Sequence, residues 1–288
     1  MDTRRIFSST LTAIILFLPL CAVGATADIQ GEAGRHVSFL FDTLWWGIFM
    51  AGFVGLMLGA YWQRDDPRIE GERVWRHDGA ARLSHWTHAA GCVLLLLSAL
   101  GLGFFFFPRL ISGTAGAAWM MNLHFLGALL FVFGGCFWLA NTIISPWRFS
   151  EHMPDKGSLI EGITHYAHIF GLTKKTVRPA KYDGSERLAF VPIVLFAALL
   201  ILTGCIKLSA RVIGWPGGLL SGMTWLHDFS ALMMLVLFVF HVLLAAVVPW
   251  SWPLLKSMFN GWVPLDFARD HHPVWFEQLE QSASEEKS

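Results

Sequence analysis

Charged residues are scarce in this chain of 288 residues, and their scarcity is the first guide to its class. Only 15% of the residues are charged, whereas a soluble domain usually carries about 25%. Apolar residues make up 55% of the chain. This composition gives no support to a soluble enzyme or a nucleic-acid-binding protein, and it predicts a membrane protein. The 21 basic and 21 acidic residues cancel, so the net charge indicates nothing about partners.

Cysteines are also few, and their spacing argues against several kinds of site. The chain has four, with no C-x-x-C pair and no C-x-x-C-H motif. This pattern is not that of a zinc ribbon, a cysteine-bound iron–sulfur cluster or covalently attached haem. One cysteine lies in the N-terminal apolar segment and three lie in later apolar runs, where we interpret them as small packing residues: Cys21, Cys92, Cys136 and Cys205.

The first residues have the features of an export signal. Arg4 and Arg5 precede an apolar stretch at 11–20, and an A-T-A sequence at 25–27 offers a cleavage site. We therefore predict a cleaved signal peptide at 1–27. A signal that stays attached as a membrane anchor is the alternative.

Five apolar segments follow, each about as long as a helix needs to cross a membrane. A hydrocarbon core of roughly 30 Å takes about 20 helical residues. We therefore predict an all-α membrane protein, with a four-helix transmembrane bundle and one extra N-terminal transmembrane helix. The predicted spans are 44–62, 85–107, 122–144, 188–207 and 225–248.

Lys and Arg give the predicted direction of these spans. They are concentrated in 63–84 and 145–187, which hold five and seven of them. Cytoplasmic loops carry such an excess, so the mature N-terminus is predicted to be periplasmic and the C-terminus cytoplasmic. The resulting organisation is a periplasmic N-terminus and first helix at 28–74, a bundle at 75–250 with the cytoplasmic loop 145–187, and a cytoplasmic tail at 251–288.

The first span carries small residues at a helical spacing of four: Ala51, Gly55 and Gly59. Small residues at this spacing let two membrane helices approach closely. Because the span has no histidine, we interpret it as a helix that either packs on the bundle or docks another subunit. The sequence leaves both open.

Four histidines lie inside or at the edges of the bundle spans. His227 and His241 are fourteen residues apart, a rotation of about 1400°, which puts them on one helix face about 21 Å apart along the axis. By depth, His241 is level with His85 near the cytoplasmic surface, and His227 is level with His124 near the outer surface. We call His85 and His241 the inner pair, and His124 and His227 the outer pair.

Two pairs of imidazoles at two depths are what two stacked bis-histidine haems require. Filling both axial positions leaves no open site for oxygen chemistry, so such haems carry electrons. We therefore predict one haem b, and hence iron, at each pair. For a single span histidine, the alternatives are a hydrogen bond to a neighbouring helix or a proton relay. His88 has no carboxylate partner on its turn, and we expect a supporting or structural role for it.

Several motifs between 75 and 279 resemble those of a known family. RLSHWTH and NLHFLG are similar to the segments that supply two of its haem ligands, and LHDFSALMMLVLFVFH is similar to the helix with the paired ligands. MPDKG, KYDGSERLAF and DHHPVW are similar to its cytoplasmic loop and its tail. The chain therefore resembles the cytochrome b, or gamma, subunit of membrane-bound formate dehydrogenases, a di-haem prokaryotic cytochrome b family.

The resemblance implies an electron-transfer and quinone-reducing subunit in the bacterial inner membrane, with the ligand pairing given above. It also implies an iron–sulfur beta subunit docked on the periplasmic side and a molybdenum- or tungsten-containing alpha subunit that oxidises formate. The chain itself shows no cluster motif, no nucleotide loop and no formate-oxidising centre. An equivalent subunit of a hydrogenase or thiosulfate reductase is the main alternative, and a haem-free transporter or proton channel is the other.

Further residues are candidates for quinone, proton and propionate binding. We expect menaquinone or ubiquinone near His241, beside the segment 158–175, with three proton carriers: Glu161, His165 and His168. An amphipathic helix at the membrane surface is the alternative for that segment. The arginines suited to haem propionates are Arg82 and Arg148 at the inner haem, and Arg109 and Arg211 at the outer one; ordinary topology signals are their alternative role.

Overall fold

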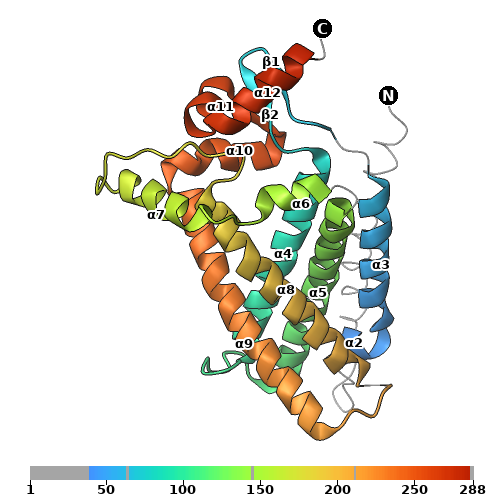
Figure 1. The fold of residues 1–288 in the computed structure, drawn as a ribbon. Helices are drawn as coiled ribbons and strands as arrows, with labels where there is room; N and C mark the ends of the chain where they lie inside the picture. Colours follow the sequence, from blue (N-terminus) through green and yellow to red (C-terminus); the bar gives the residue numbers. More distant parts are fainter. Residues whose placement is uncertain (1–38, 63–64, 144–145, 211, 286–288) are drawn as a thin grey trace.

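The computed structural model describes residues 39–62, 65–143, 146–210 and 212–285. The predicted signal peptide and Arg211 lie outside the described residues, as does the side chain of Arg148. Most of the described chain is helical, and long helices stand side by side below a smaller cap of short elements (Figure 1).

Within these described ranges, four helices are long and apolar enough to cross a membrane, which confirms the predicted helical membrane bundle. They are α4 (Gly79–Leu102), α5 (Gly113–Ile143), α8 (Gly184–Ser209) and α9 (Gly217–Val242), and α9 continues into the π-helical turn η1 (Leu243–Val247).

All four helices begin earlier than the predicted spans, and α8 does so by four residues. The start of α4 is six residues before His85, that of α5 nine before Asn122, and that of α9 eight before Trp225. The extra turns are rich in Gly, Ala and Ser, so hydropathy marks only the apolar part of each helix. At α4 the start is fixed by Asp78, whose Oδ1 accepts a hydrogen bond of 2.8 Å from the backbone N–H of Ala81.

The four helices form two hairpins. Helix α4 packs along α5, and α8 packs against α9, whereas the backbones of the two hairpins approach closely at few points in the described chain. Side chains fill the space between the hairpins. One core cluster draws on all four helices: Cys92, Leu96, Phe131, Ala197 and Met234. A buried apolar layer therefore separates the level of the inner pair from that of the outer pair.

A shorter helix, α3 (Trp46–Tyr61), lies against α5, next to the one-turn helix α2 (Leu40–Thr43). Its 16 residues span about 24 Å, less than the roughly 30 Å of a bilayer core, because the chain turns just before it. Gly55 and Gly59 are buried, and a Cβ added at Gly55 would lie 2.5 Å from the carbonyl oxygen of Phe133 in α5. The small residues therefore serve packing on the bundle.

The cap contains a three-stranded antiparallel sheet that the sequence analysis did not predict. Strand β2 (Arg73–Trp75) pairs with β1 (Arg68–Glu70) and with β3 (Trp262–Pro264), so the tail joins the segment before α4. Helices η2 (Pro249–Ser251), α10 (Trp252–Asn260), α11 (Leu265–His271) and α12 (Pro273–Glu285) complete the tail. A buried cluster holds the cap together: Val74, Val263, Ala268, Trp275 and Phe276.

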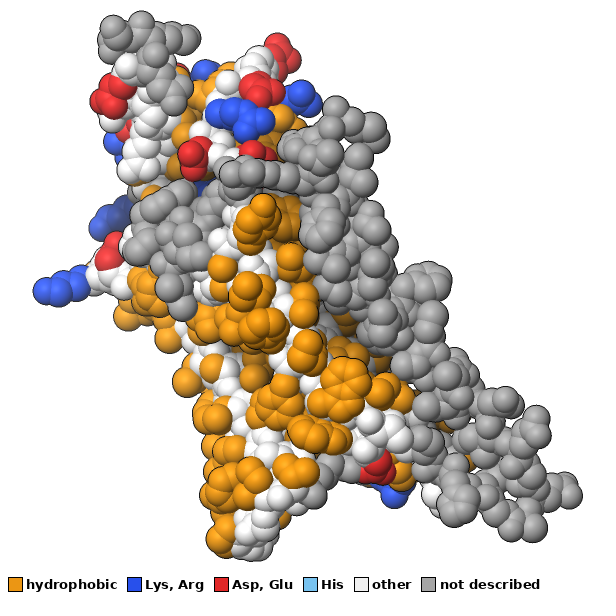
Figure 2. Space-filling view, turned by 90° about the vertical axis from the view of Figure 1, so that its right-hand side faces the viewer, with side chains coloured by type: hydrophobic (Ala, Val, Ile, Leu, Met, Phe, Trp, Pro, Cys, Tyr) orange, Lys and Arg blue, Asp and Glu red, His pale blue; other side chains and the backbone are white. Residues whose placement is uncertain are grey.

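The loop between α5 and α8 contributes α6 (Pro146–His152) and α7 (Ser158–Ile169) at the same end of the bundle as the cap. Helix α8 then starts at a capping box, in which Asp183 and Glu186 each bond the other's backbone N–H. Figure 2 shows one face of the molecule, with apolar side chains along the bundle and most charged side chains at the cap. This distribution is that of an integral membrane protein.

Candidate functional site

The structure brings the four predicted histidines together as two pairs. His85 of α4 faces His241 of α9 with 6.1 Å between ring centroids and 60° between ring planes. His124 of α5 faces His227 of α9 with 6.4 Å between centroids and 52° between planes. Helix α9 thus supplies one member of each pair, and each hairpin supplies one member to each pair.

These separations suit two imidazoles that bind one metal ion from opposite sides. A bond from histidine nitrogen to metal is about 2 Å, and the ring centre lies about 1.1 Å behind that nitrogen, so the two centres should be about 6.3 Å apart. Among the described residues, no group of three or more His, Cys, Asp or Glu side chains could hold a metal. Two-histidine sites lack the four ligands of structural zinc but match the two axial positions of haem.

Buried hydroxyl groups fix the outer histidines. Thr203 Oγ1 lies 2.8 Å from His227 Nδ1, and Ser98 Oγ lies 2.9 Å from His124 Nδ1. Thr203 donates its hydroxyl proton to the carbonyl oxygen of Leu199 at 2.6 Å, and Ser98 donates its own to that of Leu95 at 2.9 Å. A hydroxyl has one proton, so a hydroxyl that donates to its helix carbonyl accepts from the imidazole Nδ1–H.

It follows that both outer histidines carry their proton on Nδ1. A neutral imidazole with N–H at Nδ1 has its lone pair at Nε2, which is the atom left to bind a metal. Ser98 and Thr203 were not among the residues predicted from the sequence. Buried polar groups in a membrane need a partner. A hydroxyl side chain within an apolar span, near the level of a predicted ligand, was therefore the signal that could have found them.

His88, three residues after His85, does not join the inner pair. Its Nδ1 donates to the carbonyl oxygen of Phe131 at 3.0 Å, and its ring stacks on that of Phe131 with 3.8 Å between centroids. This contact ties α4 to α5.

Helix α2 covers the outer pair on the side of α5. The ring of Phe41 lies 6.4 Å from that of His124 and 5.1 Å from that of Phe125. The backbone N–H of Leu40 donates to Asn122 Oδ1 at 2.8 Å, in a buried position. Helix α2 therefore packs beside His124 of the outer pair.

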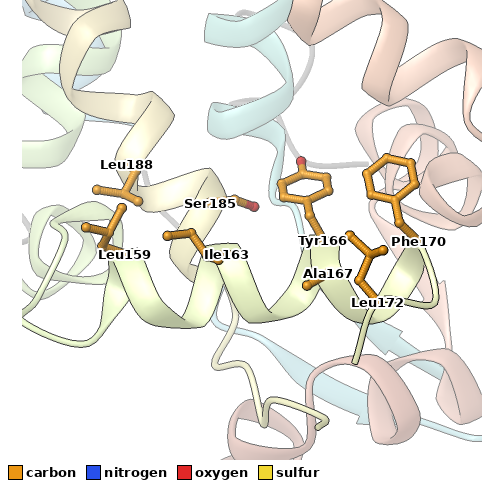
Figure 3. A pocket seen from close by; sticks show the side chains of 9 residues that line it. Leu159, Ile163, Tyr166, Ala167, Phe170, Leu172, Ser185 and Leu188 are labelled. Atoms are coloured by element: carbon orange, nitrogen blue, oxygen red, sulfur yellow. The ribbon is translucent and has the colours of Figure 1, made fainter. Parts of the chain in front are cut away.

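Helix α7, which carries the predicted proton residues, has two opposite faces. One face holds Leu159, Ile163, Tyr166 and Phe170, spaced by four, three and four residues. With Ser185 and Leu188 of α8 they line an apolar hollow of about 480 Å³, and Figure 3 shows their side chains on the same side of α7. Glu161, His165 and His168 repeat at four and three residues, offset by about 200° on the helix.

The polar face of α7 lies against the start of α8. Glu161 Oε2 forms a 2.7 Å ion pair with Arg187, and His165 Nε2 lies 3.8 Å from Asp183 Oδ2. His168 is exposed and its Nδ1 lies 3.2 Å from the carbonyl oxygen of Thr173. Among the described residues, no hydrogen bond or ion pair of these three predicted proton carriers reaches His241.

The described arginine candidates for propionates have protein partners. Arg82 donates to the carbonyl oxygen of Phe259 at 2.7 Å and its guanidinium lies over the ring of Trp75. Arg109 is exposed and donates to the carbonyl oxygen of Ile111 at 2.8 Å. The structure places Arg82 in the first turn of α4, bonded to α10 of the tail, and Arg109 in the loop after α4.

A buried arginine that the sequence analysis did not identify joins the cap to the loop. The Arg76 guanidinium donates to the carbonyl oxygen of Lys181 and lies 5.1 Å from the ring of Trp275. His272 donates from Nδ1 to the carbonyl oxygen of Ala180 at 2.9 Å. Burial and the charge of Arg76 lower the pKa of His272 to about 2, so this imidazole is neutral at physiological pH.

Comparison with known proteins gives a family match and several relatives. Residues 76–261, which include both histidine pairs, match the family described as prokaryotic cytochrome b561. The formate dehydrogenase cytochrome b556(fdo) subunit of Escherichia coli (strain K12) is 24% identical over 219 residues, covering 73% of this chain and 95% of that protein.

Two further relatives have similar names and similar coverage. The nitrate-inducible formate dehydrogenase cytochrome b556(Fdn) subunit of the same organism is 25% identical over 211 residues, covering 72% of this chain and 92% of that protein. The formate dehydrogenase cytochrome b556 subunit of Haemophilus influenzae is 25% identical over 224 residues, covering 74% and 87%. The likeness therefore extends over nearly the full length of these proteins.

Proposed function

Because the chain belongs to the prokaryotic cytochrome b561 family, whose members bind haem b, we propose that it is the di-haem cytochrome b subunit of a formate dehydrogenase. The names of its relatives support this enzyme complex. In this proposal His85 and His241 hold the inner haem, and His124 and His227 hold the outer haem. When bound, the haems supply one-electron carriers at two depths of the membrane.

The observation that carries the proposal is the separation of the two pairs. Centroid distances of 6.1 Å and 6.4 Å leave room for one metal ion between the rings of each pair. His227 and His241 share one face of α9, so both sites lie between the same two hairpins. The buried hydroxyls of Ser98 and Thr203 leave Nε2 of the outer histidines free to coordinate.

The direction of the chain in the membrane supports electron entry at the periplasmic end of the bundle and quinone reduction at the cytoplasmic end. Basic residues are concentrated in the loops at the cap, so we place the cap in the bacterial cytoplasm. The periplasmic end, near the outer pair, is then where an iron–sulfur subunit would deliver electrons from a molybdenum- or tungsten-containing formate-oxidising subunit. Quinone would be reduced at the cytoplasmic end, near His241.

In this proposal the polar face of α7 supplies protons for quinone reduction. Glu161 and His165 lie on α7 of the cytoplasmic loop, against the start of α8, where a carboxylate and an imidazole can hold exchangeable protons. His168→Gln should then slow quinone reduction without changing the haem content, and normal turnover would count against this role. His168→Gln keeps a polar side chain at an exposed position, so folding should be unaffected.

Removal of single ligands tests the haem assignment. The purified protein in lipid nanodiscs should show b-type absorption bands and two haems per chain by a pyridine haemochrome assay. His241→Ala and His227→Ala should each leave one haem, and the double variant none. Two haems in either single variant would refute the assignment of that pair, and no haem in the wild-type protein would refute the proposed function.

A further inference from the structure

The two histidine pairs differ in the hydrogen bonds that hold their imidazole rings. Each outer histidine has a buried hydroxyl partner, since Ser98 and Thr203 are both 0% exposed and bond the Nδ1 atoms of His124 and His227. Within the described part of the chain, no such hydrogen bond is made by the ring nitrogens of His85 or His241. The asymmetry is built into two different helices, α4 and α8, which both direct a hydroxyl at the outer level.

The local geometry makes each hydroxyl an acceptor for the ring. Thr203 Oγ1 lies within reach of the carbonyl oxygens of Leu199 and Leu200, at 2.6 Å and 3.3 Å, and Ser98 bonds that of Leu95. Because each hydroxyl proton is used within its own helix, the imidazole N–H donates to the oxygen, and this contact holds both the tautomer and the ring orientation.

We propose that Ser98 and Thr203 are positioning residues that lower the midpoint potential of the outer haem, an inference that rests on the proposed function. An imidazole that donates its Nδ1–H becomes a more basic ligand at Nε2. A more basic ligand stabilises ferric iron, which carries one more positive charge, relative to ferrous iron. The hydroxyls therefore make the outer iron a better electron donor.

Charged groups near the outer pair do not depend on these hydroxyls. Lys207, in the last turn of α8, is close enough to His124 and His227 to act on both electrostatically, and its charge opposes formation of ferric iron. Asp228 carries the opposite charge close to Lys207. Both groups stay in place when a hydroxyl is removed, so a variant that lacks only the hydroxyl isolates its effect.

The consequence is a bias in the direction of electron flow. With haem held at both pairs, one electron would pass from ferrous iron at the outer pair to ferric iron at the inner pair, oxidising the first and reducing the second. No proton would have to move, because both outer imidazoles keep their Nδ1–H. Lowering the outer potential favours this inward transfer. It leaves the inner potential, set by His85 and His241, unchanged.

Anaerobic redox titration of the holoprotein in nanodiscs, followed by its visible spectrum, tests the inference. In Ser98→Ala and Thr203→Val the midpoint potential of one haem should rise by about 59 mV. This rise corresponds to about a tenfold change in the equilibrium constant for electron transfer between the two haems. The second haem should keep its wild-type potential, and the low-spin ferric signal of the shifted haem should change in electron paramagnetic resonance.

Three variants serve as matched controls. Ser98→Thr and Thr203→Ser keep the hydroxyl, so they should keep the wild-type potential. Thr87→Val removes a buried hydroxyl of α4 that donates to the carbonyl oxygen of Leu83 at 2.8 Å and bonds no histidine. It should leave both potentials unchanged.

The possible results separate the inference from the proposed function. A wild-type protein with two haems, combined with unchanged potentials in Ser98→Ala and Thr203→Val, would overturn the inference alone. If those variants lose the outer haem while Ser98→Thr and Thr203→Ser retain it at its normal potential, the positioning role is supported. Shifted potentials in the hydroxyl-retaining variants would indicate a packing effect and overturn it.

Discussion

His85 of α4 faces His241 of α9 with 6.1 Å between their ring centroids, although 156 positions separate them in the chain. Helix α9 also carries His227, so one helix fixes the depth and the rotation of half of each site. The hairpin of α4 and α5 supplies the other half. The relative register of the two hairpins therefore decides whether both sites exist together.

A one-residue insertion in α9 should separate the two sites. An alanine inserted after Val236 turns His241 by about 100° relative to His227 without removing either side chain. One of the two histidines of α9 can then still face its partner, while the other cannot. We therefore expect one haem per chain by haemochrome assay. Val236→Ala, at an exposed position of the same helix, is the control and should keep two. Two haems in the insertion variant would show that the helix face is not the determinant.

Replacement of His88 should leave both haems in place. In His88→Leu the hydrogen bond to the carbonyl oxygen of Phe131 is lost, which should lower the free energy of unfolding by about 1 kcal/mol. The haem content and visible spectrum should be those of the wild type, because His88 lies outside both pairs. Thermal unfolding in nanodiscs, with the haemochrome assay alongside, measures both quantities. Loss of a haem would instead make His88 a ligand.

The pairing of the histidines could be predicted from the sequence because helix geometry and membrane depth are both readable along the chain. The fourteen-residue interval between His227 and His241 places both on one face of α9. The order of the spans gives the depth of His85 and His124 in the membrane. The helix starts could not be predicted in the same way, since hydropathy detects the apolar core of a span and not the polar turns that precede it.

The cap and the hydroxyl partners depend on contacts between distant segments. Strand β2 pairs with β3 across almost 190 positions, and three-residue strands leave no alternating pattern long enough to detect. Thr203 and Ser98 each lie on a different helix from the histidine they bond, so the sequence shows a hydroxyl in an apolar span but not its partner. The two faces of α7 could be seen from its spacing, whereas the contacts of Glu161 needed the fold.

A large side chain at Gly55 should detach α3 from the bundle. A Cβ there would lie 2.5 Å from the carbonyl oxygen of Phe133, so Gly55→Leu cannot fit without moving α3 away from α5. Overpacking of this kind usually costs about 1–3 kcal/mol. We expect a lower thermal unfolding temperature with both haems still bound, because neither pair includes α3. Gly222→Leu, where a Cβ meets open space, is the control. Equal stability of the two variants would contradict close packing at Gly55.

Acidification should loosen the cap, and His272 should carry part of the effect. Burial and Arg76 hold its pKa at about 2 in the folded protein, compared with about 6.5 when the tail is detached. Below pH 6.5 the detached tail therefore binds a proton that the docked tail does not, so docking is weakened as the pH falls. The loss is about 1.4 kcal/mol for each pH unit. Burial, with Arg76 and Lys181, also lowers the pKa of His77, which adds in the same direction.

Hydrogen–deuterium exchange of the segment 262–285 in nanodiscs at pH 7.5 and pH 5.5 measures this docking. Wild-type protein should lose protection against exchange at pH 5.5. In His272→Asn, which cannot take up a proton, the loss of protection between the two pH values should be about tenfold smaller. His271→Asn changes the exposed neighbour and should behave as the wild type. Because the carboxylates around Arg76 are the same in all three proteins, the difference between His272→Asn and wild type reports His272 alone. An identical pH response in the two would show that this imidazole does not couple docking to pH.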